Sequence, residues 1–153
     1  MEQLASILED VGDGNRLAPL AERLIAQFPD RDSGRYYRAA ALFLRSRASD
    51  AAAAARLVLA ANPHHAKAQN LLGVACAADG RLECARSAFE AAIGLSPRDP
   101  SPYLNLGVFY LQTANPQAAA DYFAEALVLD GASAMAREGL AQSRAARSAR
   151  QRP

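Results

Sequence analysis

The chain has 153 residues, 51% of them hydrophobic, and carries 17 Lys and Arg against 16 Asp and Glu. This length suits one domain with a buried core, and a formal net charge of +1 excludes a global field that would attract nucleic acid or a membrane. No apolar run reaches the roughly 18 residues of a membrane helix, and the first residues lack a secretion signal. We therefore expect an all-helical cytoplasmic protein; a periplasmic chain without its leader, or a piece of a larger protein, would look the same.

The first two helices are expected on either side of a turn at residues 12–15, with apolar residues at helical spacing before and after it. We expect Pro19 in the first turn of the second helix, where its missing N–H costs little. The turn resembles the start of a calcium loop. However, Ala21 stands where that loop needs a bidentate Glu, so a helix-breaking turn is the better interpretation.

A second helix pair is expected between residues 33 and 61, with its turn at residues 46–49. Asp32 or Ser33 can cap its first helix. Its second helix opens with five alanines, residues 51–55. Alanine is the strongest helix former and lets helices approach closely, so we expect tight packing here; a flexible low-complexity linker is the alternative.

The third pair is expected at residues 66–78 and 82–95. Gly73 has no side chain, which would let the facing helix approach closely at Ala85. A large residue at Gly73 should therefore overpack this contact and cost about 1–3 kcal/mol. The adjacent histidines before this pair, residues 64–65, have no third ligand at a metal-site spacing, so we expect solvated loop histidines and no metal.

The fourth pair is marked by an N-cap residue followed by proline at residues 101–102 and again at 115–116. Gly131 is expected to end the pair through a left-handed cap. One more helix is expected over residues 133–149. Its apolar face is expected to carry Met135, Leu140 and Ala141.

Cys76 and Cys84 fall eight residues apart across the turn of the third pair. Intracellular cysteines are usually buried and reduced, so we expect two small apolar side chains here. A disulfide within the hairpin is the alternative. Neither cysteine has the His and carboxylate neighbours of a nucleophile.

The third and fourth pairs share the same residues at an offset of 34 positions. The matched slots are Leu72 and Leu106, Gly73 and Gly107, Ala85 and Ala119, Phe89 and Phe123, and Ala92 and Ala126, with Pro29, Pro63, Pro97 and Gly131 one step apart at the ends of units. This period and the Leu-Gly and Ala-x3-Phe slots are those of the tetratricopeptide repeat, which the chain therefore resembles. The resemblance implies an all-α fold, a right-handed α-solenoid of stacked antiparallel helix pairs.

The resemblance also divides the chain, taken as a single domain over residues 1–153. Units are expected at about 1–31 (atypical), 32–65 (divergent), 66–99 and 100–133 (both clear), followed by a capping helix at 134–150 and a tail at 151–153. Terminal units of a stacked array are often atypical, because one of their faces has no neighbour.

Members of this family usually bind a peptide or a helix on a concave surface that the first helix of each unit lines. Transferring those positions gives a candidate peptide-binding groove of Tyr36, Ala40, Phe43, Lys67, Asn70, Val74, Ala77, Leu104, Val108, Leu111 and Gln112. Most of these side chains are apolar. Lys67 and Asn70 alone do not make the convergent clamp that holds a C-terminal carboxylate. The resemblance therefore implies a partner with apolar anchors.

The function predicted from the sequence is a non-catalytic protein–protein interaction scaffold without a cofactor. No glycine loop for phosphate, catalytic triad or paired-carboxylate pocket can be recognised. The alternatives are a regulatory or assembly module of a larger enzyme or complex, and a self-association module that would form a homo-oligomer. RNA reading by the related 35-residue helical repeats is disfavoured by the 34-residue step and the near-neutral charge, so no nucleic-acid partner is expected.

Overall fold

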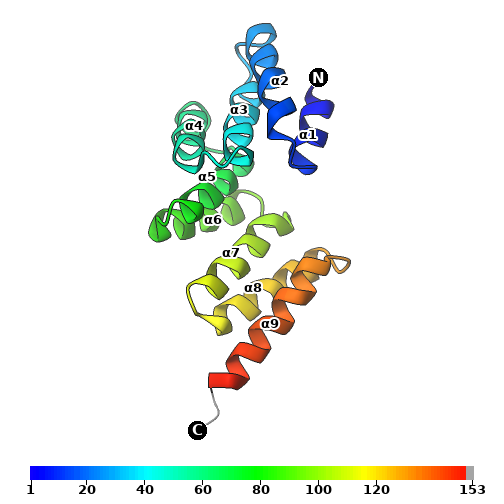
Figure 1. The fold of residues 1–153 in the computed structure, drawn as a ribbon, viewed down its shortest axis with the longest axis vertical. Coiled ribbons are helices and arrows are strands. Elements are labelled where there is room, and N and C mark those ends of the chain that lie inside the picture. Colours follow the sequence, from blue (N-terminus) through cyan, green and yellow to red (C-terminus); the bar gives the residue numbers. More distant parts are fainter. Residues whose placement is uncertain (151–153) are drawn as a thin grey trace. The chain divides into compact units, whose positions relative to one another are not determined.

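The computed structural model describes residues 1–150, and the predicted tail at 151–153 lies outside them. Within that range the chain forms helices and no strand, in the order that Figure 1 labels. The helices are α1 (Glu2–Asp10), α2 (Gly14–Gln27), α3 (Ser33–Leu44), α4 (Ala48–Ala61), α5 (Ala66–Ala78), α6 (Leu82–Leu95), α7 (Pro100–Gln112), α8 (Pro116–Leu129) and α9 (Ala134–Arg150). The predicted all-α fold class is confirmed.

The chain forms two compact units, and the boundary between them falls inside α6. Unit 1 comprises residues 1–88 and unit 2 residues 89–153. Within each unit, helices that follow one another along the chain pack against each other, for example α2 on α3 and α7 on α8. Among the described residues, no helix combines the length and the apolar character that crossing a bilayer requires.

The turn inside each helix pair has the same backbone geometry, repeated every 34 residues. Gly12, Ser46, Gly80 and Ala114 all adopt positive φ angles, of 73°, 60°, 72° and 60°. The amide that follows each of them donates a hydrogen bond to the carbonyl five residues before it, as from Arg47 to Leu42 at 2.9 Å. This is the Schellman motif, which satisfies the last carbonyls of a helix. The repeat is therefore visible in the backbone even where the glycine is missing.

Other helix ends differ from the sequence prediction in places. Gly131 does not adopt a positive φ, so the left-handed cap predicted there is wrong. α7 begins at Pro100 rather than at Pro102, because Asp99 Oδ1 accepts the amide of Ser101 at 2.9 Å and caps the helix two residues earlier. The predicted cap at Asn115 is confirmed, with its Oδ1 accepting the amide of Ala118.

Pro19 lies farther inside α2 than predicted. Asp13 caps this helix by accepting the amide of Arg16 at 3.0 Å, so the helix already begins at Gly14. Pro19 is then the sixth residue of the helix, and its missing N–H leaves the carbonyl of the exposed Asn15 to solvent.

The core of unit 1 depends on small residues. The alanine run is part of α4, and Ala51, Ala52 and Ala55 are fully buried, so the close-packing interpretation holds and the flexible linker is excluded. Larger buried side chains such as Leu17, Leu24 and Val58 fill the remaining space. Alanine at the contacts lets the helix backbones approach closely.

The core of unit 2 is built around Phe123, which is 1% exposed. Added methyl groups at Gly107 on α7 and at Gly139 on α9 would both meet the Phe123 ring. The ring therefore occupies the space that these two glycines leave, one on each of two helices. Ala119, Ala126 and Ala136 complete the buried cluster.

Candidate binding surfaces

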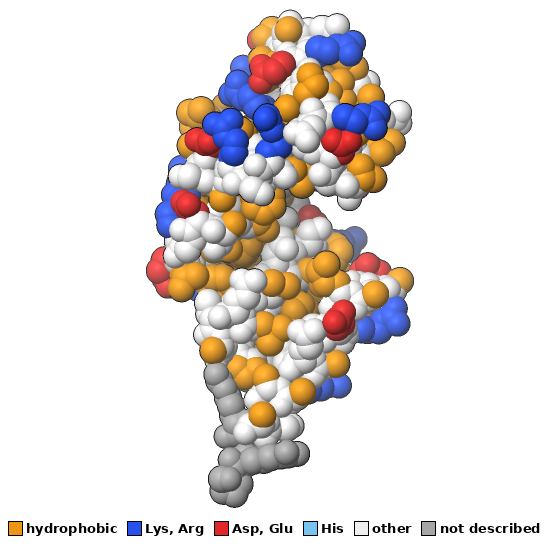
Figure 2. All heavy atoms as spheres, viewed as in Figure 1, with side chains coloured by type: hydrophobic (Ala, Val, Ile, Leu, Met, Phe, Trp, Pro, Cys, Tyr) orange, Lys and Arg blue, Asp and Glu red, His pale blue; other side chains and the backbone are white. Residues whose placement is uncertain are grey.

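Unit 2 contains a hollow of about 620 Å³ between α7, α8 and α9. Its lining residues are Val108, Leu111 and Gln112 of α7, Phe123 of α8, and Met135, Glu138, Gly139, Gln142 and Ala146 of α9. Figure 2 shows hydrophobic side chains on the face of this unit that is turned toward the reader, in the lower half of the view. The hollow therefore brings together three of the four groove residues predicted in this unit.

The helix period explains why these side chains line one hollow. Residues three and four positions apart share a face of a helix, as do Val108, Leu111 and Gln112 on α7. Val108 and Leu111 are half-buried against the Phe123 cluster, so part of each side chain remains accessible. The remaining predicted residue, Leu104, lies one turn earlier on α7. It is partly buried against the same cluster but does not line the hollow.

The second wall of the hollow comes from α9, which the sequence predicted only as a capping helix. Met135 is 63% exposed, so it does not lie on the buried face predicted for it. Ala141 is exposed as well, and the buried face of α9 carries Ala136, Gly139 and Ser143 instead. A signal for this wall existed in the sequence. One more step of 34 residues from Leu104 and Val108 leads to Glu138 and Gln142.

The hollow combines an apolar floor with a polar rim. Phe123, Val108 and Leu111 form the apolar part, and the rim carries Gln112, Glu138 and Gln142. Gln142 Nε2 donates to Glu138 Oε1 at 3.1 Å, which orients both side chains along α9. Such a site can bury an apolar anchor while polar groups on its rim fix the anchor's orientation.

In unit 1 the predicted groove residues differ in their exposure. Tyr36 and Ala40 are 6% and 2% exposed, which leaves little of either side chain for a ligand. Phe43, Asn70, Val74 and Ala77 are half-buried, and Lys67 is exposed.

Tyr36 is buried because its polar group has partners inside unit 1. Its hydroxyl donates a short hydrogen bond to Glu9 Oε1, and its ring stacks on His65 with centroids 5.1 Å apart. Burial raises the pKa of Glu9 above its ordinary value, although the Tyr36 hydrogen bond opposes this rise. Burial also raises the pKa of Tyr36, and the Glu9 charge adds to that rise. Tyr36 therefore remains a neutral donor.

The two histidines have different environments. His64 is exposed, whereas His65 is half-buried and caps α5, its Nδ1 accepting the amide of Ala68 at 3.1 Å. His65 is therefore a structural residue, not the solvated loop histidine that the sequence predicted. No group of three or more His, Cys, Asp or Glu side chains with metal-site geometry occurs within residues 1–150.

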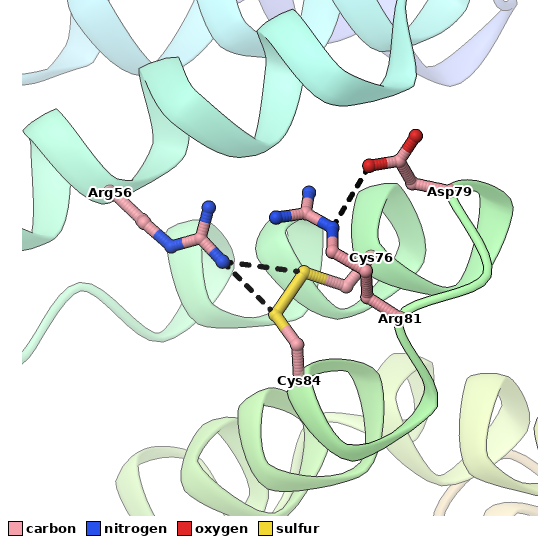
Figure 3. Close-up of a disulfide and its surroundings, with 5 residues drawn as sticks. All are labelled: Arg56, Cys76, Asp79, Arg81 and Cys84. Atoms are coloured by element: carbon pink, nitrogen blue, oxygen red, sulfur yellow. Dashed lines mark hydrogen bonds and ion pairs between the residues drawn. A yellow bond between two sulfur atoms is a disulfide. The ribbon is translucent and has the colours of Figure 1, made fainter.

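Cys76 and Cys84 form a disulfide between α5 and the first turn of α6, so the expectation of two reduced thiols is wrong (Figure 3). The hairpin turn places the two Cα atoms 5.8 Å apart, within the range that a disulfide can span. The sequence left this alternative open, because the spacing of two cysteines does not fix their distance in space.

The family model for the tetratricopeptide repeat matches residues 45–100 and 85–134. These two overlapping matches cover more than half of the chain, and the chain belongs to the tetratricopeptide repeat family. A search of curated proteins returned no match.

Solved structures support the same fold. The tetratricopeptide repeat protein TTC0263 from Thermus thermophilus superposes with a TM-score of 0.83 at 22% identity, over 96% of this chain and 83% of that one. PilF of Pseudomonas aeruginosa superposes with a TM-score of 0.80 at 20% identity, over 97% of this chain and 68% of that one. A chain of the APC/C hetero-tetramer Cut9–Hcn1 superposes with a TM-score of 0.86 at 20% identity, over 94% of this chain and 28% of that one. These likenesses show the α-solenoid fold, and proteins of this family are in general non-catalytic interaction modules.

Proposed function

We propose that this chain is a non-catalytic scaffold that binds a peptide or a helix of a partner protein in an apolar groove. The observation that carries the proposal is the hollow of unit 2, where Val108 and Leu111 remain accessible above the buried Phe123. We take residues 1–153 as one domain of four repeat units and a capping helix. Its cytoplasmic localisation stays a prediction from the sequence.

The chemistry of the hollow favours a particular kind of ligand. An amphipathic helix or an extended segment can insert Leu, Ile or Phe anchors against Val108, Leu111 and Met135. Among the described residues of the lining, Glu138 alone is charged, so a neutral or basic residue beside the anchor suits the rim better than an acidic one.

Two other functions remain as alternatives. The chain could act as a regulatory or assembly module of a larger enzyme or complex, as the structural neighbour Cut9–Hcn1 belongs to a hetero-tetramer. It could also self-associate through the same apolar surface. Measuring both partner capture and molecular mass separates these cases.

The test compares Val108→Glu with Val128→Glu. Val108 lines the hollow, whereas Val128 is 79% exposed on α8 and lies outside it, so the two variants carry the same chemical change at different places. Both should keep the helicity of the natural chain in circular dichroism. We expect Val108→Glu to lose the partner that the immobilised natural chain captures from source lysate, and Val128→Glu to retain it, because a charge in an apolar site must be desolvated.

Equal capture by both variants would contradict the proposed groove. Light scattering on the purified natural chain gives the second result. Self-association is favoured over binding of a different protein if the natural chain has a molecular mass above that of one chain and the Val108→Glu variant has the mass of a single chain.

A further inference from the structure

The two sulfurs of the disulfide differ in their access to solvent. Cys76 is fully buried, whereas Cys84 is half-buried in the first turn of α6. A thiol or disulfide reagent from solution can therefore reach Cys84 Sγ more readily than Cys76 Sγ. This asymmetry distinguishes the pair from a disulfide whose two sulfurs are both enclosed in a core.

Two arginine side chains lie near the disulfide. Arg56 of α4 donates from Nη2 to Cys84 Sγ at 3.3 Å and approaches Cys76 Sγ at 3.8 Å (Figure 3). Arg81 lies beside them at the turn, with its Nε 2.9 Å from Asp79 Oδ2. Its buried Nη2 has no hydrogen-bond partner among the described residues. Neighbouring guanidinium groups stabilise a thiolate over a thiol, and a helix N-terminus acts in the same direction.

The nearby acidic groups weaken this effect only in part. Glu83 is adjacent to Cys84 in sequence, but it is exposed and pairs with Arg86 at 2.8 Å. Asp79 faces Arg81 rather than the sulfurs. The guanidinium of Arg56, by contrast, contacts both sulfurs directly.

We propose that Cys76 and Cys84 form a reversible thiol–disulfide modification site, with Cys84 as the sulfur that reacts with solution and Cys76 as the resolving sulfur. The substrates are a low-molecular-weight disulfide as oxidant and a low-molecular-weight dithiol as reductant. This inference does not depend on the identity of the partner that the groove binds.

Oxidation proceeds in two exchange steps. The Cys84 thiolate attacks one sulfur of the low-molecular-weight disulfide, so a mixed disulfide forms and one thiolate leaves. The Cys76 thiolate then attacks Cys84 Sγ, which forms the internal disulfide and releases the second thiolate. The two protons of the protein thiols pass to the two released thiolates. In reduction, one thiolate of the dithiol attacks Cys84 Sγ, and Cys76 leaves as a thiolate beside Arg56. The second thiolate of the reagent then attacks the mixed disulfide and releases Cys84.

The first test measures the reactivity of Cys84 alone. In the Cys76→Ser variant, Cys84 should be alkylated by iodoacetamide at neutral pH about tenfold faster than in the same chain unfolded in urea, because a free cysteine is only a few per cent thiolate at that pH. Adding Arg56→Gln should slow the reaction several-fold, whereas adding Arg23→Gln, at an exposed site without a sulfur contact, should leave it unchanged. Equal rates for the folded and unfolded chains, or no effect of Arg56→Gln, would overturn the proposal.

The second test examines reversibility in the natural chain. The oxidised chain is titrated with dithiothreitol, free thiols are counted by mass spectrometry after alkylation, and helicity is followed by circular dichroism. We expect both thiols to appear together while the helical signal is retained, and oxidised glutathione to restore the disulfide. If the thiols appear only as the helical signal is lost, the disulfide is a permanent crosslink and the proposal is wrong.

Discussion

The glycine at position 107 gives a sharp test of how unit 2 packs. A methyl group added to Gly107 would lie 2.7 Å from Cδ1 and Cε1 of the Phe123 ring, closer than real side-chain contacts allow. The ring is 1% exposed and is in close contact with Gly139 of α9 as well as with Gly107, so any shift of the ring must also disturb its packing against α9. Gly107→Ala must therefore displace the ring or separate α7 from α8, at a cost of about 1–3 kcal/mol for overpacking.

Alanine is also a better helix former than glycine, and this gain opposes the packing cost by about 1 kcal/mol. Gly94→Ala is the matched control because Gly94 is exposed on α6, in the same unit, and an added methyl would meet no atom within 4 Å. The same residue change occurs in both variants, so the difference between them isolates the packing cost. We expect Gly94→Ala to be neutral or slightly stabilising.

Urea titration monitored by circular dichroism gives the free energy of unfolding of each of the two variants. The free energy of Gly107→Ala should lie about 1–3 kcal/mol below that of Gly94→Ala. Adding Phe123→Leu to each variant should shrink this difference, because the smaller side chain vacates the space that the methyl needs. Two variants that agree within about 0.5 kcal/mol, or a difference that Phe123→Leu leaves unchanged, would refute the packing described for unit 2.

Three further predictions concern the core, the turns and pH. Leu106 is fully buried, so Leu106→Ala should lower the free energy of unfolding by about 2–5 kcal/mol in urea titration; a loss below about 0.5 kcal/mol would show that its slot in the repeat is misassigned. Ser46 holds a φ of 60° that favours glycine, so Ser46→Gly should raise the melting temperature, whereas Gly80→Ala should lower it; shifts of the opposite sign would contradict the assigned backbone. The pKa of Glu9 is raised in the fold, so the stability linked to its protonation is complete below its unfolded pKa and is lost as pH rises through the folded pKa. Glu9→Gln keeps an acceptor for Tyr36 and cannot ionise, so its stability relative to the natural chain should increase between about pH 4.5 and pH 7.5 in urea titrations; a constant difference would show that Glu9 titrates normally.

The fold could be predicted because the residues that define it interact locally. The Leu-Gly and Ala-x3-Phe slots recur in the third and fourth helix pairs, and Phe123 packs against Gly107 as such a repeat requires. Cap residues were less predictable when alternatives stood close together. Asp99 and Ser101 can both begin α7, and the choice depends on which side chain reaches the free amides.

The candidate site was predictable in part. Val108 and Leu111 follow from the repeat register, and both line the hollow. α9 was missed as a wall because it lacks the Leu-Gly signature, although its position one step after α7 was visible in the spacing. The burial of Tyr36 could not be foreseen, because it depends on Glu9, which lies 27 residues away in the sequence.

The pairing of the cysteines was unpredictable for a different reason. Their spacing in sequence is compatible with free thiols as well as with a bond, and only the 5.8 Å between their Cα atoms decides which is possible. The position of Arg56, 28 residues before Cys84, likewise has no signal in the repeat pattern.

The packing of Phe123 has a practical consequence for recombinant work on this chain. A fragment that stops at the end of the fourth repeat, near residue 133, would lack α9 and leave an aromatic ring facing water where Gly139 now covers it. Exposed aromatic surface of this kind promotes aggregation. A shortened version intended for crystallisation or spectroscopy should therefore extend at least through residue 150.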